Sequence, residues 1–473
     1  MKQFKNRKST LLKSIIGGKL RKIYYMSYPE SDTDISKSLG FYKIGESASV
    51  SMTQLAGGTF LASLLLSQNF NEEGLAVVFG LSNIASIIQI FTMIKVEQMF
   101  KRKPFVCGSV LLKLCFGLIF FVPLLQGFDV FKQLIIAALF LIGYIGMQIS
   151  NAPSKDWVSR MVNANGRGYY FAKTDAFSVA AITVLTITMG FVMDWSKDNN
   201  ETTGFLIVGL VLIALAMINF VSFSLMKEKR LTRLNEQGQE IHGSKLKREL
   251  VNEPKSKGLS LVSEIKYAFS SDKFRRELML GLLFATAFQM GLPFNASYQI
   301  KELELSFSFI MIVGAVANML RIYVSPKIGK LGDHYGIAKV LKYAFIGLLM
   351  HHVFMSLATK SNAVIIIPIA IVFAGLAWSF VGTGLLSVQF ELLDHTRLTI
   401  QLSIVSLFTS AWGYITILIS TRLFDMFRQL FDYYDIPLFP QQGLNMINVG
   451  VYLIMILYIH YRIQPLSIKN ENK

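Results

Sequence analysis

The stretch GFLIVGLVLIALAMINFVSFSLM, residues 204–226, holds no charged side chain. At about 1.5 Å per residue, a helix of this length is about 35 Å long, enough to cross a hydrocarbon layer of about 30 Å. Backbone amides inside such a layer must be paired within their own segment, so the stretch is predicted to be a helix and not an open strand.

Eleven further runs of this kind lie on both sides of it. They do not alternate as the shorter strands of a membrane barrel would. The composition agrees, since 52% of the 473 residues are hydrophobic and 16% are charged, against about 25% in soluble domains. We predict an all-α membrane protein with twelve transmembrane helices, at residues 45–68, 74–94, 105–123, 132–153, 174–194, 204–226, 278–299, 305–325, 339–359, 363–388, 399–420 and 443–462.

The net charge of +17 could suggest a nucleic-acid partner, but its distribution indicates otherwise. With the N-terminus placed inside, 40 Lys and Arg fall in inside segments and six in outside segments. This split follows the positive-inside rule, so the charge predicts topology and attraction to anionic lipid. We expect both termini in the cytoplasm, membrane lipid as a partner and no nucleic acid. Cys107 and Cys115 share one apolar run, so neither a disulfide nor a metal site is predicted, and no cofactor is expected.

The longest connection divides the twelve runs into six and six. Within it, residues 259–274 place apolar side chains at helical spacing, which favours a short amphipathic helix on the membrane surface over a partly ordered linker. The predicted organisation is a basic N-terminal segment at 1–43, a six-helix bundle at 44–226, a cytoplasmic linker at 227–276, a second six-helix bundle at 277–462 and a tail at 463–473.

The two halves show weak similarity to each other. A shift of 235 residues places Asn83 of the second run on Asn318 of the eighth, and residues 94–103 on 329–338. Together with the six-plus-six division, this predicts two like-oriented bundles. A cavity between such bundles can open first to one face and then to the other, so alternating access is the expected function.

An octapeptide follows the eighth run: Gly329-Lys330-Leu331-Gly332-Asp333-His334-Tyr335-Gly336. It resembles the loop signature Gly-x-Leu-x-Asp-Arg/Lys-x-Gly of the major facilitator superfamily. Gly329 and Gly336 would permit a tight turn and close helix approach. The resemblance implies that Asp333 belongs to an inner latch favouring one transport state, while His334 departs from the family's Arg or Lys. A generic polar turn is the alternative.

The equivalent first-half loop, residues 96–103, keeps the basic end of the signature at Arg102 and Lys103. It lacks the glycines, and Gln98 stands where the acid would be, so a strong first-half latch is not expected. The predicted latch consists of Gly329, Asp333, Gly336, Arg102 and Arg321. Arg321 is expected to pair with Asp333 or Glu97, or to lie at the lipid headgroups.

Three other stretches resemble one bacterial branch of this superfamily: residues 157–160 with 167–171, residues 271–276, and Glu46 with residues 57–60. The resemblance covers most of residues 40–462. It implies a secondary transporter in a bacterial cytoplasmic membrane, but it does not identify the solute.

In the fold of this family the cavity is usually formed by the first, fourth, seventh and tenth helices. Amides and aromatic rings there would suit an uncharged or amphipathic solute, although each could instead be a helix–helix contact. The candidates for the substrate cavity are Gln54, Tyr144, Gln148, Gln289, Asn295 and Trp378, with Trp412, Ser406 and Ser410 added from the eleventh run.

Ionisable groups within the runs are costly in lipid and therefore informative. Glu46, near the inner end of the first run, is the candidate for ion coupling, with an interfacial Glu at a helix start as an equal alternative. Lys113 could neutralise an acid or extend to the interface. His351 and His352 are expected to be neutral groups bonded between helices, with a proton relay as the alternative, and no third ligand makes them a metal site.

The leading hypothesis is a monomeric secondary transporter that moves a small solute by rocking two halves, with ion or proton coupling or by facilitated diffusion. A proton-antiport efflux pump for drugs or metabolites is the alternative. Two hypotheses from other classes are a transporter-like sensor and a membrane-embedded lipid-modifying enzyme centred on Asp394 and His395.

Overall fold

The computed structural model describes residues 32–96, 102–125, 129–159, 161–162, 167–228, 232–234, 240–242, 261–394 and 398–466. His395, Glu97 and Gln98, which the sequence analysis singled out, lie outside these ranges.

The first half of the chain forms a series of helices, some of which are broken. The first predicted run is two helices that meet at an angle of 41°, and Gly58, at the break, has a φ of +52°, a left-handed conformation that suits glycine. The elements are α2 (Asp32–Leu55), α3 (Gly58–Ser67), α4 (Glu72–Val96), α5 (Lys103–Leu111), α6 (Leu114–Ile119), η1 (Val122–Leu124), α7 (Asp129–Ser159), α8 (Arg167–Asn199) and α9 (Glu201–Leu225).

The second half forms longer helices, two of which continue into single π-helical turns. Its elements are α12 (Asp272–Ser297), η3 (Tyr298–Glu302), α13 (Phe307–Tyr335), α14 (Ile337–Leu357), α15 (Ala363–Leu392), α16 (Leu398–Tyr433), α17 (Pro440–Tyr458) and η5 (Ile459–Ile463).

Between the halves lie a small hairpin and a short helix. Strands β1 (Thr232–Leu234) and β2 (Glu240–His242) pair antiparallel, an addition to the all-helical prediction. A short helix, α11 (Leu261–Ser270), lies within the amphipathic segment predicted at 259–274, and its place on the membrane surface stays a prediction. It packs against α12 and α16.

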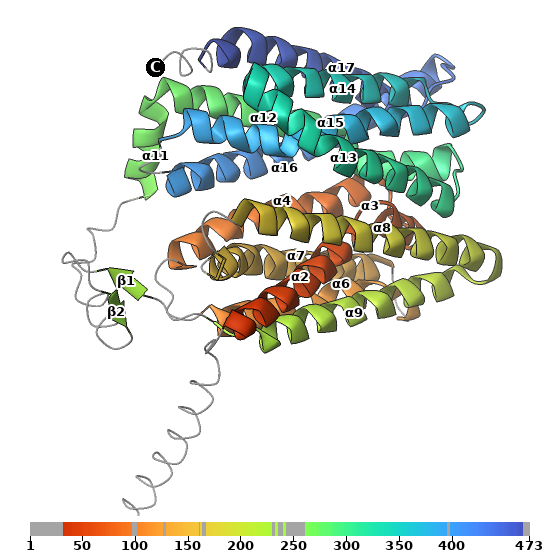
Figure 1. Cartoon of the computed structure of the whole chain (residues 1–473). Coiled ribbons are helices and arrows are strands. Elements are labelled where there is room, and N and C mark those ends of the chain that lie inside the picture. Colours follow the sequence, from red (N-terminus) through yellow and green to blue (C-terminus); the bar gives the residue numbers. More distant parts are fainter. Residues whose placement is uncertain are drawn as a thin grey trace, which may run out of the picture.

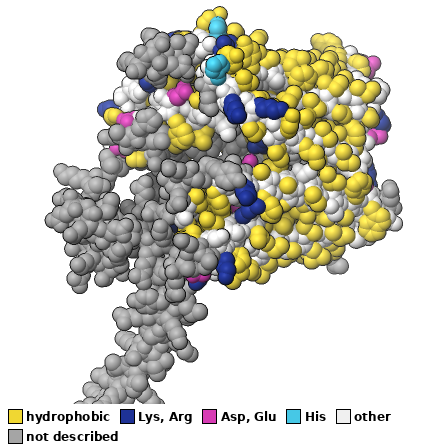
Figure 2. Space-filling model, in the orientation of Figure 1, with side chains coloured by type: hydrophobic (Ala, Val, Ile, Leu, Met, Phe, Trp, Pro, Cys, Tyr) yellow, Lys and Arg dark blue, Asp and Glu magenta, His cyan; other side chains and the backbone are white. Residues whose placement is uncertain are grey.

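The helices form two bundles with roughly parallel axes, α2–α9 in one and α12–α17 in the other (Figure 1). The hairpin and α11 lie at one end of both bundles, which we call the linker end. The opposite end, where α3 is followed by α4 and η3 by α13, is called the far end. Hydrophobic side chains cover most of the described surface in Figure 2, and Lys and Arg lie mostly towards the linker end.

Each of the twelve predicted runs coincides with one of these helices or helix series. Within the described residues, nine helices are long and apolar enough to cross a membrane, and the bent pair α2–α3 makes ten. The other two runs correspond to α4 and to the broken series α5–α6–η1. The all-α membrane fold is therefore confirmed, whereas the count of twelve crossings remains a prediction.

Several helices extend beyond the predicted apolar runs. Helix α2 begins at Asp32, inside the segment assigned to the basic N-terminal tail. Helix α13 continues to Tyr335, ten residues beyond the predicted end at 325. Hydropathy locates the part of a helix in lipid, but backbone hydrogen bonding can continue past the headgroups where the residues favour a helix.

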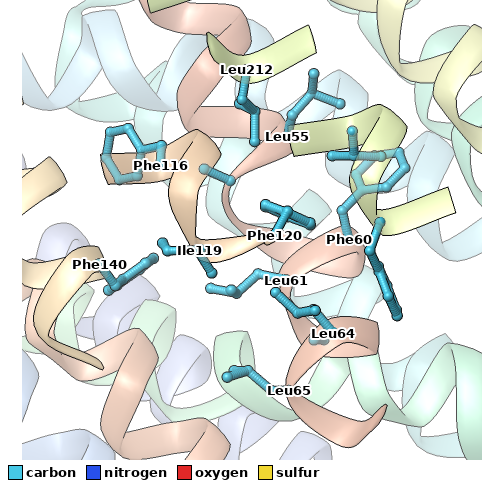
Figure 3. Packing of buried hydrophobic residues seen from close by; sticks show 14 of the residues in the cluster. Leu55, Phe60, Leu61, Leu64, Leu65, Phe116, Ile119, Phe120, Phe140 and Leu212 are labelled. Atoms are coloured by element: carbon cyan, nitrogen blue, oxygen red, sulfur yellow. The ribbon is translucent and has the colours of Figure 1, made fainter. Parts of the chain in front are cut away.

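The largest core cluster lies in the first bundle (Figure 3). Leucine and phenylalanine side chains of α3 lie against aromatic and aliphatic side chains of α6 and of Phe120, the residue after it. All of them are at most 2% exposed: Phe60, Leu61, Leu64, Leu65, Phe116, Ile119 and Phe120. This packing holds the broken first and third runs together as a unit.

Two helix pairs form the main contacts between the bundles, and α12 also contacts α3 and α4. Helix α4 packs on α16, and α8 packs on α13. In the order of the predicted runs, these are the second with the eleventh and the fifth with the eighth. A shift of six runs converts one pair into the other, which is the relation expected for two like-oriented halves.

Candidate functional site

A cavity of about 470 Å³ lies where the two bundles meet. Its wall comes from α12, α15 and α16 of the second bundle and from α4 of the first. The described lining residues are Asn83, Glu277, Gly281, Phe284, Ala285, Phe288, Gln289, Leu385, Gln389, Leu402, Ser403, Val405, Ser406, Thr409 and Ser410. The volume is within the range of about 300–1,000 Å³ typical of small-molecule sites.

The charged group in this lining is Glu277, on the second turn of α12 near the linker end. The residue is 1% exposed. Gln389 of α15 lines the same cavity, and the Oε2 of Glu277 has no partner among the described residues. A buried carboxylate with an unfilled acceptor is poised to bind a proton, a cation or a donor group.

At the end of the cavity farthest from the linker end, one hydrogen bond joins the two bundles. The Nε2 of Gln289 on α12 donates to Oδ1 of Asn83 on α4, at 3.1 Å. The Nδ2 of Asn83 has no partner among the described residues. Gly413 of α16 allows this approach, because a Cβ there would lie 3.2 Å from both Asn83 Oδ1 and Gln289 Cγ. Two amides from opposite halves therefore face the same space.

At the far end, a carboxylate of one bundle binds the first turn of a helix in the other. The Asp194 oxygens of α8 accept hydrogen bonds from the backbone N–H of Phe307 at 2.7 Å and of Ser308 at 2.8 Å. These N–H groups start α13 and have no partner within the helix. The negative charge also suits the positive end of the helix dipole.

A second polar contact at the far end joins α4 to α12. Ser297 Oγ donates to Oε2 of Glu72 at 2.8 Å. Lys301 Nζ lies 3.8 Å from Oε1 of the same carboxylate. Apolar packing continues beside it, where Phe60 of α3 stacks on Phe307 at 6.2 Å between ring centroids. The polar and apolar contacts together close the far end between the bundles.

The cavity lies on the linker-end side of these contacts. Its lining reaches from Glu277, close to the start of α12, to Gln289, about three turns deeper. The two halves are thus joined at one end and enclose the cavity towards the other, which is the asymmetry that alternating access requires.

The predicted cavity residues divide into three groups. Gln289 lines the cavity, as do Ser406 and Ser410. Trp378 lies behind the lining, with its ring 6.1 Å from Phe284 and 5.7 Å from Phe288. Trp412 donates through Nε1 to Thr286 Oγ1 at 2.8 Å, next to the lining residue Ala285.

The remaining four lie elsewhere. Gln54 is exposed near the end of α2 and is outside the described lining. Tyr144 packs against Phe116 and Phe140 in the first-bundle core. Gln148 donates to Ser86 Oγ of α4 at 2.6 Å, a contact within the first bundle. The side chain of Asn295 lies beside Gly291 and Asn448, towards α17 and away from the cavity.

Among the lining residues that sequence reasoning missed, three carry a carboxylate or an amide: Glu277, Gln389 and Asn83. Glu277 and Gln389 stand just outside the predicted runs 278–299 and 363–388, so hydropathy assigns them to the flanking segments. Asn83 was used only for the internal repeat. A search for polar side chains one turn beyond each apolar run would have found the first two.

The predicted turn at 329–336 is wrong in extent. Residues 329–335 are helical, and the turn is confined to Gly336, where φ is +89°. Gly329 has open space around it. Close approach occurs instead at Gly332, where a Cβ would lie 2.9 Å from the Phe380 ring of α15.

The expected Arg321–Asp333 pair is also wrong. Both residues lie on α13, twelve residues apart, which is about 18 Å along the axis and beyond side-chain reach. Glu97 and the side chain of Asp333 are outside the described part, so the latch as a whole stays a prediction. Arg102 lies in the first bundle, where its backbone N–H donates to Glu228 Oε1 at 2.6 Å and joins α5 to the end of α9.

Glu46 lies within α2, fourteen residues or about 21 Å from its first residue, so it does not stand at a helix start. Its role in ion coupling and its place relative to the headgroups stay predictions. Lys113, between α5 and α6, is 3% exposed and does not extend to the interface. Its Nζ donates to Ser49 Oγ at 2.8 Å and to Asn219 Oδ1 at 3.4 Å.

The adjacent histidines bond between helices as expected. His351 Nδ1 lies 2.9 Å from the carbonyl oxygen of Ala370 on α15. His352 Nδ1 lies 2.7 Å from Oδ1 of Asn445 on α17. Within the described residues there is no group of three or more His, Cys, Asp or Glu side chains that could hold a metal ion.

Comparison with known proteins gives a consistent result. The family model of the Major Facilitator Superfamily matches residues 47–417. No curated protein matches the chain in sequence. Among solved structures, a mutant of the nucleoside transporter NupG is similar with a TM-score of 0.63 at 11% identity, covering 91% of this chain and 98% of its own. The inward-open xylose transporter XylE from E. coli has a TM-score of 0.62 at 14% identity, and the match covers 91% of this chain and 95% of that chain. An autoinhibited POT family peptide transporter has a TM-score of 0.64 at 11% identity, and the match covers 90% of this chain and 96% of that chain.

Proposed function

The chain belongs to the major facilitator superfamily, and we propose that it moves a small solute by alternating access of the cavity between α4, α12, α15 and α16. It is a multi-pass integral membrane protein and a secondary transporter, not an enzyme. The observation that carries the proposal is a cavity lined by α12, α15 and α16 of the second bundle and by Asn83 of the first, on one side of the contacts that join the bundles at the far end.

The solute contacts follow from the lining. Amides of Asn83, Gln289 and Gln389 and hydroxyls of α16 offer hydrogen bonds, while Phe284 and Phe288 offer an apolar face. Such a site suits a small solute with both polar groups and an apolar or ring surface. Binding there would draw the linker ends together and loosen the far end, because Asn83 and Gln289 connect the halves.

Glu277 replaces Glu46 as the first candidate for ion coupling. Its carboxylate borders the cavity, whereas Glu46 lies in the first bundle and is not among the described lining residues. Proton or cation binding at Glu277 would remove a buried charge and allow the surrounding helices to close. Transport would then depend on the ion as well as on the solute.

The distribution of Lys and Arg supports a bacterial cytoplasmic membrane, with the linker end and both termini in the cytoplasm. The structure would then correspond to the state in which the cavity faces inward. The chain would act as a monomer, with the two bundles as its moving parts and residues 227–276 as the connection between them.

The test is solute flux in proteoliposomes, with a panel of labelled sugars, nucleosides, peptides and amphipathic drugs and with an imposed pH gradient. We expect gradient-dependent uptake of at least one class. Glu277→Gln should abolish its response to the pH gradient while counterflow of the solute persists. Asp272→Asn, an exposed acid on the same helix, is the matched control and should keep that response.

Specific outcomes distinguish the alternatives. Binding without counterflow would favour a sensor. Outward transport of drugs that is driven by protons moving inward down their gradient would favour an efflux pump. Lack of both binding and flux across the panel would count against the proposal. Equal pH dependence in Glu277→Gln and the parent protein would remove Glu277 from the coupling step.

A further inference from the structure

A second hollow, of about 590 Å³, lies on the outside of the second bundle. It is formed by the end of α13, the first half of α14 and the middle of α15, and it shares no described residue with the solute cavity. Apart from Lys339, the described lining residues are apolar or aromatic; Leu331, Ile346 and Leu376 are each more than a third exposed. In a membrane-spanning bundle, such a surface faces lipid.

The linker end of this groove carries positive charge and tyrosine. Lys339 lines it, and its Nζ lies 5.5 Å from the ring centroid of Tyr335, another lining residue. Lys342, one turn further on α14, has its Nζ 5.3 Å from the ring of Tyr343, which also lines the groove. Lysine with tyrosine is the pattern found where helices meet the headgroup region.

The other end of the groove is purely apolar. It reaches Met350 on α14 and Phe373 on α15. Lys339 and Met350 are eleven residues apart, or about 16 Å along the helix, close to the depth of one leaflet in a hydrocarbon core of about 30 Å. The groove therefore offers cationic groups at headgroup level and an apolar channel one leaflet deep.

We propose that this groove is a binding site for one anionic phospholipid of the leaflet at the linker end. The phosphate lies at Lys339 and Lys342, and an acyl chain lies along α14 between α13 and α15. Charge complementarity selects the anionic headgroup over a zwitterionic one. The length of the groove selects a lipid over free phosphate, which would leave the apolar part unfilled. The site is independent of the proposed solute cavity.

The experiment measures lipid retention by native mass spectrometry, using the full chain in mild detergent with phosphatidylglycerol or phosphatidylcholine added. Two variants separate the two ends of the groove: Lys339→Gln with Lys342→Gln at the cationic end, and Ile346→Trp to fill the apolar part. Lys173→Gln is the control for loss of charge. Lys173 is an exposed lysine near the linker end of α8 in the other bundle. Leu210→Trp, on an exposed position of α9, is the control for added bulk.

We expect one retained phosphatidylglycerol per chain, at least fivefold preferred over phosphatidylcholine. The double lysine variant should lose the preference, and Ile346→Trp should lose retention of both lipids. Lys173→Gln and Leu210→Trp should behave as the parent protein. Equal retention of the two lipids, an equal loss in the control variants, or competition by inorganic phosphate alone would overturn the proposal. Melting temperatures of all variants verify that each is folded.

Discussion

The carboxylate of Asp194 is a single side chain that joins the two bundles at the far end. It accepts two backbone hydrogen bonds from the first turn of α13. Loss of such a cap costs about 1 kcal/mol, which corresponds to about a fivefold change in an equilibrium. Because the bonds exist only while the far end is closed, we expect Asp194→Ala to shift the population towards the far-end-open state.

A cysteine at Ala296 reports this shift, because Ala296 is 8% exposed and packs in the first-bundle core cluster. In a background with Cys107→Ala and Cys115→Ala, an impermeant maleimide should label Ala296→Cys about fivefold faster when Asp194 is replaced. Asp129→Ala is the control, since Asp129 accepts from Asn69 within the first bundle. The idea fails if the two acid replacements change labelling equally.

Sequence patterns identify individual site residues poorly in this chain. Gln289 and Asn295 are both predicted to line the cavity, but only Gln289 lies in the lining of the cavity described above, whereas Asn295, on the same helix, lies towards α17. Spans that are apolar all round give no amphipathic stripe, so the sequence does not indicate which face of a helix points to the cavity. Only the packing of the complete bundle determines this.

At the scale of elements, two glycines that the family signature treats alike have different conformations near the turn between α13 and α14. Gly336 has a φ of +89°, which strains any other residue, whereas Gly329 is helical with open space. We expect Gly336→Ala to lower stability by about 1–2 kcal/mol. Gly329→Ala should raise it by about 0.5–1 kcal/mol, because alanine is the better helix former.

The measurement is the melting temperature in detergent, followed by intrinsic tryptophan fluorescence. If the signature required a turn at both glycines, both variants would lose stability. A fall in both melting temperatures would therefore contradict the helical assignment of residues 329–335.

The elements themselves could largely be predicted. Apolar runs located the helices because each must hide its backbone from lipid, and the amphipathic pattern located α11. The ends could not be predicted, as α2 and α13 show, since helices outlast the apolar segment at the headgroups. The break between α5 and α6 at Lys113 was missed because a hydropathy count does not detect a local change of backbone geometry.

At the scale of the whole molecule, transport requires the far end to open while the linker end closes. Glu72 of α4 and Ser297 of α12 meet across the bundles at 2.8 Å between Oε2 and Oγ. A short bismaleimide linking Glu72→Cys to Ser297→Cys, in the cysteine-free background, would hold that end shut. We expect the cross-link to abolish flux in proteoliposomes while solute binding from the linker end persists.

A matched pair tests whether the effect comes from blocked rocking or from chemical modification. Asn69 and Asp129 also lie at the far end, with Nδ2 and Oδ2 3.1 Å apart, but both belong to the first bundle. Cross-linking Asn69→Cys to Asp129→Cys should leave flux unchanged, because a bundle that moves as a rigid body keeps this distance constant. Undiminished flux in the linked Glu72–Ser297 pair would show that the bundles do not separate at the far end, and the rocking mechanism would have to be abandoned. Loss of flux in both pairs would mean that rearrangement within the first bundle is itself part of the transport step.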